Sequence, residues 1–234
     1  MVEDGFAQLT LSLAQRPAME FDSFFAGANV QLVSRLQALA RGEVHPWLYL
    51  WGPEQSGRSH LLQALTQLAQ EHEQRAFYLA AAEARALSPA LTENLHDFQL
   101  LVIDDIQWLM EAPDWAESLF HLYNKFKDMG GVLVVSATAP PGRLQTGLLD
   151  LRSRLQAMEV YHLQPLNDTE KARALRWLAR QRGFHLSEEL VAFIMARSDR
   201  TMAALKQVIE RLDELSLQQK RVVTIPFVKK VMGW

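Results

Sequence analysis

The segment at residues 52–59 limits the folds open to this chain more than any other stretch. It has the pattern G-x4-G-R-S and directly follows an apolar run at 47–51. Its glycines allow a tight turn in which successive backbone N–H groups point inward, toward a polyphosphate. The positive end of a following helix would favour the same anion. We therefore expect a phosphate-binding loop between a strand and a helix; a plain glycine turn is the alternative.

Arg58 stands where loops of this pattern usually have lysine. Arginine keeps a fixed charge and can bond phosphate oxygens, but its planar fork is longer and bulkier than an ammonium group. We expect nucleotide binding to survive this replacement and turnover to suffer. The hydroxyl of Ser59 would bind Mg²⁺. The residues expected to bind the nucleotide are Gly52, Gln55, Ser56, Gly57, Arg58, Ser59 and His60.

Strand-like and helix-like segments alternate between residues 21 and 163. The strand candidates are 47–51, 76–81, 100–106, 132–138 and 159–163. Two helical patterns with an apolar face, 59–71 and 114–128, lie between them. Continuous apolar strands are typical of sheets that helices cover on both faces. The alternation predicts an α/β fold with a parallel five-stranded sheet and right-handed crossovers.

After Pro165 the strand signal fades and helical patterns take over. A capping box at 167–170 opens the first predicted helix, and Ser187 caps the second. A third helix covers 199–219, and Pro226 starts a short fourth. Short helices behind an α/β core suggest a small all-α lid. We expect three parts: an extended segment at 1–20, an α/β nucleotide-binding domain at 21–163 and a lid domain at 164–234.

Two carboxylates end the third strand candidate. Asp104 and Asp105 follow an apolar run at the C-terminal edge of the sheet, where α/β folds bind ligands. Asp104 would hold Mg²⁺, and Asp105 would orient or polarise an attacking water. Solvated turn residues or helix caps are the alternative. Thr138 ends the fourth strand candidate, where its hydroxyl would sense a γ-phosphate or merely cap a turn.

Three arginines are candidates for contact with phosphates. Arg152 and Arg154 precede the fifth strand candidate, from where either could reach a neighbour's phosphates and stabilise transition-state charge in trans. Surface arginines are more often solvated charges. Arg200 opens the third lid helix and could reach the chain's own nucleotide, although periodicity alone makes it an exposed residue.

An alternating segment precedes the α/β region. Its candidate anchors are Gln8, Leu9, Leu11 and Leu13. The segment is either an edge strand or an extended peptide that docks into a partner's groove through alternate side chains.

Composition narrows the class of protein. The 234 residues include no cysteine, which excludes disulfides, thiolate metal ligands and cysteine nucleophiles. A formal charge of −3 gives no general attraction to nucleic acid or to an anionic membrane. No apolar run approaches the ~18 residues that a membrane span needs. We expect a cytoplasmic protein without a membrane partner.

Together these motifs resemble the AAA+ ATPases and, within them, the DnaA-homologous Hda-type regulators of replication initiation. The resemblance covers residues 21–234 and rests on the segments 21–24, 27–29, 52–59, 103–107, 153–155 and Arg200. It implies an AAA+ P-loop NTPase core followed by a lid, with ADP or ATP and Mg²⁺ as cofactors. By this resemblance Arg154 is an arginine finger acting in trans, Arg200 is the sensor 2 arginine, and Asp104 and Asp105 are the Walker B acids.

The resemblance also implies a function. Such a regulator works with ADP bound, docks on the sliding clamp (the β subunit) of DNA polymerase III and stimulates ATP hydrolysis by the initiator DnaA. The segment from Gln8 to Leu13 matches the family's clamp-binding motif. Through this activity the regulator prevents re-initiation. It activates a partner's ATPase rather than acting as a robust ATPase itself. A homo-oligomer stays open, and no sequence-specific DNA contact is expected.

Two departures from the family pattern keep an alternative open. Relatives have Asp-Arg where this chain has Thr138 and Ala139, which puts a sensor 1 role of Thr138 in doubt. The Asp-Asp pair of Walker B resembles the initiator more than the regulators, so residual ATPase activity stays open. The alternative function is an autonomous AAA+ ATPase switch of the helicase-loader type. The mildly acidic charge argues against a DNA-binding initiator fragment.

Overall fold

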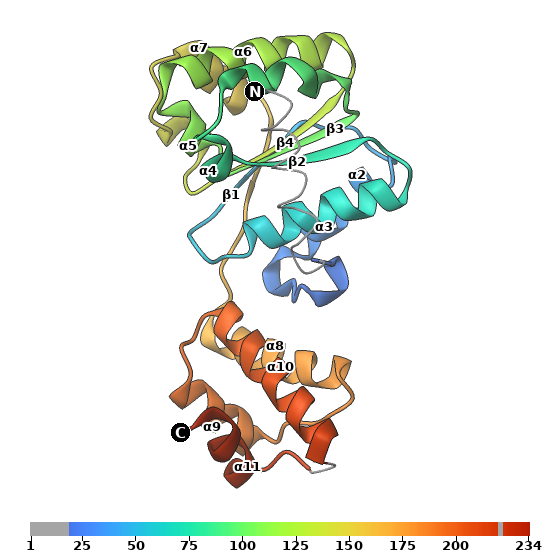
Figure 1. Cartoon of the computed structure of the whole chain (residues 1–234), viewed down its shortest axis with the longest axis vertical. Helices are drawn as coiled ribbons and strands as arrows, with labels where there is room; N and C mark the ends of the chain where they lie inside the picture. Colours follow the sequence, from blue (N-terminus) through green and yellow to red (C-terminus); the bar gives the residue numbers. More distant parts are fainter. Residues whose placement is uncertain (1–18, 220–221) are drawn as a thin grey trace. The chain divides into compact units, whose positions relative to one another are not determined.

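The computed structural model describes residues 19–219 and 222–234 (Figure 1). The predicted clamp-binding segment at Gln8 to Leu13 lies outside the described residues. The chain divides into two compact units, Met1–Gln164 and Pro165–Trp234. Among the described residues, no helix combines the length and the apolar character that crossing a bilayer requires.

A parallel five-stranded sheet with the order β2-β3-β4-β1-β5 forms the centre of the first unit. Its strands are β1 Leu48–Trp51, β2 Ala76–Ala80, β3 Leu100–Asp104, β4 Val132–Ala137 and β5 Glu159–His162. The predicted sheet and its parallel strand direction are therefore confirmed. The third strand is shorter than predicted because Asp105 has a left-handed backbone with a φ of 56°, which no strand accommodates.

Helices cover both faces of this sheet (Figure 1). One face packs against α2 (Val30–Ala40) and α3 (Arg58–Glu71), and the other against α5 (Gln107–Met110), α6 (Pro113–Asp128) and α7 (Leu149–Gln156). Short elements complete the unit: η1 Phe21–Ser23, η2 Gly27–Asn29, α4 Ala81–Ala84, η3 Pro89–Asp97 and η4 Pro141–Arg143. Successive residues of a strand face opposite sides, so Leu48 and Leu50 join the core under α3 while Tyr49 joins the core under α6.

The second unit is all-α in its described part. Its helices are α8 Asp168–Gln181, α9 Glu188–Arg197, α10 Met202–Gln219 and α11 Ile225–Met232. Their core is apolar and includes Leu175, Ile194, Leu205, Leu212 and Val228. The predicted capping box is confirmed, since Asn167 and Glu170 exchange two side-chain to backbone hydrogen bonds of 2.9 Å.

The third helix of this unit begins later than predicted. Thr201 accepts a hydrogen bond of 3.1 Å from the backbone N–H of Ala204, which is the geometry of a helix cap. α10 therefore begins at Met202. Arg200 lies in the turn before the helix instead of opening it.

Candidate functional site

The loop at residues 52–57 joins the carboxyl end of β1 to the amino end of α3. Gly57, the last residue before α3, has a φ of 99°, and a Cβ there would lie 2.8 Å from the ring of Phe24. At Gly52 an added Cβ would lie 2.7 Å from the carbonyl oxygen of Leu163. Both positions therefore require glycine, one for its backbone angle and both for close packing. The sequence folds locally into the loop that its spacing predicts.

Arg58 points back into this loop. Its side chain is 6% exposed, and its Nη1 donates hydrogen bonds to the carbonyl oxygens of Gly52 and Pro53. Its Nη2 forms an ion pair of 2.7 Å with Oδ1 of Asp105. One guanidinium group thus connects the loop after β1 with the end of β3.

Asp104 faces a different set of partners. It is 5% exposed, and its carboxylate accepts hydrogen bonds from the hydroxyls of Tyr78, at 2.6 Å, and Ser136. The same Ser136 hydroxyl accepts a hydrogen bond of 2.8 Å from the backbone N–H of Asp105. This network joins the carboxyl ends of β2, β3 and β4. Sequence reasoning missed Tyr78, although a hydroxyl inside an otherwise apolar strand is a signal that such a partner exists.

Two buried polar atoms of the loop have no hydrogen-bond partner among the described residues. They are Oγ of Ser56 and Nε of Arg58. Buried polar groups in proteins are nearly always hydrogen bonded, so an unpaired group calls for a partner. Both atoms belong to the segment predicted to bind phosphate. The loop therefore fits an anionic ligand that brings hydrogen-bond acceptors.

The residues predicted to bind Mg²⁺ offer oxygen atoms, which this ion prefers. Ser59 is exposed in the first turn of α3, and both carboxylate oxygens of Asp104 are hydrogen bonded. Within the described residues no group of three or more histidine or carboxylate side chains is placed to hold a metal. This donor set fits an ion that takes its other ligands from phosphates and water, as Mg²⁺ commonly does.

The segment at residues 20–24, which precedes α2, lies against the loop and the first turn of α3. The ring of Phe24 lies 5.5 Å from the ring of His60, between centroids. The Nε2 atom of His60 lies 2.9 Å from the carbonyl oxygen of Glu20 and 3.3 Å from the hydroxyl of Ser23. His60, which we expected to bind the nucleotide, is therefore oriented by the segment before α2.

The candidate arginines lie in different settings. Arg154 of α7 stacks over the rings of Phe120 and Tyr123 of α6, at 4.8 and 5.1 Å from the ring centroids. Burial raises the pKa of Tyr123, and the charge of Arg154 acts in the opposite direction. The described residues give Arg152 no such ring contact and no ion pair. The structure thus gives different settings to Arg152 and Arg154, which their positions in the sequence alone left equivalent.

The remaining predicted residues lie at the surface. Arg200 forms an ion pair of 2.7 Å with Asp168 inside the second unit, and both side chains are 57% exposed. A hydrogen bond of 3.3 Å runs from its Nε to the carbonyl oxygen of Met195. Thr138 is exposed directly after β4. For both residues a role at the nucleotide stays a prediction.

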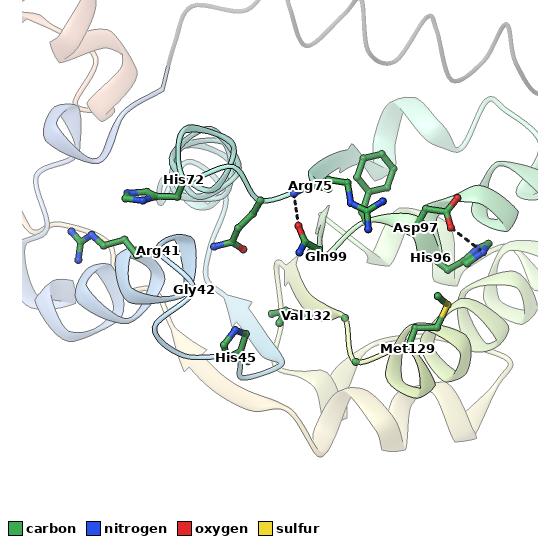
Figure 2. Close-up of a pocket in the computed structure, with 14 residues that line it drawn as sticks. Arg41, Gly42, His45, His72, Arg75, His96, Asp97, Gln99, Met129 and Val132 are labelled. Atoms are coloured by element: carbon green, nitrogen blue, oxygen red, sulfur yellow. Dashed lines mark hydrogen bonds and ion pairs between the residues drawn. The ribbon is translucent and has the colours of Figure 1, made fainter.

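A concave region lies at the opposite, amino edge of the sheet (Figure 2). It is a cavity of about 450 Å³ next to the starts of β2, β3 and β4. Arg41, His72 and Met129 line it, and they are the residues that follow α2, α3 and α6. A cation stabilises the partial negative charge at the carboxyl end of a helix. The basic side chains of this cavity therefore balance the partial negative charge at the carboxyl ends of these helices.

Comparisons with known sequences identify two matching families. Residues 15–160 match the family described as the bacterial DnaA ATPase domain. Residues 168–232 match the family described as the Hda lid domain. A protein of Haemophilus influenzae, described as uncharacterized, is 35% identical over 227 residues, which cover 97% of this chain and 98% of that protein.

Solved structures have the same fold. Domain III of the Thermotoga maritima replication initiation protein DnaA has a TM-score of 0.74 at 22% identity, over 93% of this chain and 97% of that one. DnaA from Aquifex aeolicus with bound AMPPCP has a TM-score of 0.72 at 18% identity, over 88% and 69% of the two chains. The predicted AAA+ fold is confirmed. The chain belongs to the DnaA-homologous AAA+ family and is an Hda-type regulator of replication initiation.

Proposed function

We propose that this chain binds ADP and, docked on the DNA polymerase sliding clamp, stimulates ATP hydrolysis by the initiator DnaA. The observation that carries the proposal is the setting of Arg154. Two aromatic rings support its guanidinium, and no carboxylate of the described residues pairs with it. An arginine with an unneutralised charge is suited to stabilise the charge that develops on a partner's phosphates. Such stimulation would prevent re-initiation in the cytoplasm.

The nucleotide part of the proposal rests on the loop. Its backbone turn, the amino end of α3 and the unpaired polar atoms of Ser56 and Arg58 suit a polyphosphate. DnaA from Aquifex aeolicus is described as bound to AMPPCP, an adenine nucleotide analogue. Ser59 and Asp104 would hold Mg²⁺, which would neutralise part of the phosphate charge. ADP rather than ATP is proposed from the family resemblance, and Arg200 would add a contact from the lid.

Replacement of the finger tests the stimulation directly. In Arg154→Ala we expect ADP binding and the thermal unfolding midpoint to stay near those of the wild type. Stimulation of initiator ATPase should fall by about a thousandfold, as for other arginines acting in trans. The assay measures phosphate release from ATP-loaded DnaA with the clamp on DNA. Arg152→Ala, a matched change in the same helix, should retain stimulation.

The opposite pattern would contradict this assignment. If Arg154→Ala still stimulates and Arg152→Ala does not, then Arg152 is the finger. If neither variant loses stimulation, α7 does not supply the residue that acts on the initiator.

Clamp docking is proposed for the segment from Gln8 to Leu13. Alternate apolar side chains with a leading glutamine suit an extended peptide in a hydrophobic groove. The double variant Gln8→Ala, Leu11→Ala should lose clamp binding in surface plasmon resonance while it keeps ADP binding. A variant with Thr10→Ala and Ser12→Ala, which alters the intervening positions, should bind the clamp normally. Full retention of binding by the first variant would refute the docking assignment.

The second candidate function is an autonomous ATPase switch. The observation that favours it is the presence of both acids, Asp104 and Asp105, at the end of β3. Steady turnover of ATP by the isolated chain at ~1 s⁻¹ or faster would support this alternative. ADP held without turnover supports the regulator.

A further inference from the structure

Arg58 and Asp105 form an ion pair. The sequence predicts that Arg58 binds phosphate and that Asp105 orients an attacking water. Their atoms Nη2 and Oδ1 are 2.7 Å apart, and the side chains are 6% and 27% exposed. A partly buried pair of this kind interacts more strongly than a fully exposed surface ion pair. The positive charge of the loop is therefore already neutralised from within the protein.

The Nη1 group of Arg58 is also committed. Its Nη1 donates to the carbonyl oxygens of Gly52 and Pro53, Nη2 uses one of its two N–H groups for Asp105, and Nε has no partner in the described residues. A phosphate oxygen that approached the guanidinium would meet the Asp105 carboxylate on Nη2. Because both are anions that accept hydrogen bonds, they compete for the same guanidinium cation.

The backbone of Asp105 is held in place. Its backbone has a φ of 56°, and its N–H donates a hydrogen bond of 2.8 Å to the hydroxyl of Ser136. The next N–H, of Ile106, donates a bond of 2.9 Å to the carbonyl oxygen of Ser136. Two bonds to β4 thus fix the backbone on either side of the carboxylate. Asp104 differs, since its carboxylate faces Tyr78 and Ser136 instead of the loop.

We propose that Asp105 is a positioning residue, an internal counter-ion that competes with ligand phosphates for Arg58 and thereby lowers the affinity of the loop for nucleotide. The proposal rests on the nucleotide binding proposed above. It replaces the role that the sequence suggested for Asp105, because a carboxylate engaged by a guanidinium is a poor group to activate water. The competition weakens binding most for the ligand with the greatest negative charge, so it acts more on ATP than on ADP.

The test is a double-mutant cycle of Asp105→Asn with Arg58→Gln, read by calorimetric titration of ADP and ATP. Asparagine has the shape of aspartate and tolerates a positive φ, so the fold is expected to persist. With Arg58 present, Asp105→Asn should tighten ATP binding by about tenfold, the size of one charge-assisted hydrogen bond, and ADP binding by less. With Arg58→Gln, the same change should have an effect of about twofold or less, because no guanidinium remains to be released.

A matched control separates this effect from a change in net charge. Asp97→Asn removes a carboxylate at the amino edge of the sheet, where its Oδ1 lies 3.4 Å from Nε2 of His96. We expect it to leave both affinities unchanged. Thermal unfolding midpoints of all variants report whether each one is folded.

The outcomes are distinct. Equal effects of Asp105→Asn with and without Arg58, or no effect on either nucleotide, would overturn the counter-ion role while nucleotide binding itself stands. A folded wild-type chain that binds neither nucleotide would overturn the proposed nucleotide binding and this inference with it. A larger gain for ATP than for ADP that depends on Arg58 supports the inference.

Discussion

Helix α3 connects two regions of opposite character. Its amino end closes the loop at residues 52–57, and His72, the residue after its carboxyl end, lines the cavity at the amino edge of the sheet (Figure 2). Both regions contain arginine. At the loop Arg58 is buried and its own Nε has no partner among the described residues, whereas Arg41 and Arg75 of the cavity are exposed. The same helix therefore offers positive charge at one end and negative charge at the other.

The comparison of the loop with the cavity shows that the number of basic residues alone does not indicate where phosphate binds. The cavity has more basic side chains than the loop, but the helix ends around it attract cations. The loop has one arginine, and the backbone N–H groups and the helix end act in the same direction as that charge. Matched substitutions at the two edges can break or sharpen this comparison.

The largest effect is expected from Gly57→Ala. The φ of 99° and the ring of Phe24, 2.8 Å from the new Cβ, both oppose a side chain. Strain and overpacking together should lower the free energy of unfolding by about 3 kcal/mol and abolish ADP binding. Urea denaturation and calorimetric titration measure the two effects.

Gly130→Ala at the amino edge is the matched control. This glycine has a φ of 73°, but an added Cβ would meet no atom within 4 Å. We expect a loss of about 1 kcal/mol from the backbone angle alone, with ADP affinity unchanged. If the two alanine variants are equally stable, close packing at Gly57 does not shape the loop.

The next largest effect is expected from Arg58→Ala, compared with Arg75→Ala at the amino edge. Arg58→Ala leaves the buried carbonyl oxygens and Asp105 without their cation, so stability should fall by about 2 kcal/mol. ADP affinity should fall by about tenfold or more with the lost charge-assisted bond. Arg75→Ala at the amino edge should change stability by no more than about 0.5 kcal/mol and leave ADP affinity as it is. A loss of ADP affinity in Arg75→Ala would instead locate a phosphate site in the cavity.

The smallest effect is expected from the loss of single hydrogen bonds in Tyr78→Phe and Gln99→Ala. Tyr78→Phe removes the buried bond of 2.6 Å to Asp104 and should destabilise the fold by about 1 kcal/mol. Gln99→Ala removes an exposed bond of 2.9 Å from the backbone N–H of Arg75 and should cost about 0.5 kcal/mol or less. Chemical denaturation of both variants checks the order. A reversed order would mean that the network at Asp104 adds nothing to stability.

Elements with a local signal were predictable from the sequence. Apolar strands and the glycine loop follow from patterns a few residues long, and the capping box at Asn167 needs only its own turn. The contacts of the site were not predictable in this way. Arg58 and Asp105 are 47 positions apart, and Tyr78 and Asp104 are 26 apart. These contacts depend on strand order, register and the backbone angle of Asp105, none of which a local pattern encodes.

The stacking of Arg154 over the rings of Phe120 and Tyr123 has a consequence for the docking of a partner. An aromatic face attracts a cation through its quadrupole and carries no net charge. Phe120 and Tyr123 therefore orient the guanidinium without neutralising it. When an anion arrives from another molecule, no carboxylate of the described residues has to leave Arg154 first, in contrast to Arg58. The charge of Arg58 is thus neutralised inside the protein, whereas the charge of Arg154 stays available to a partner.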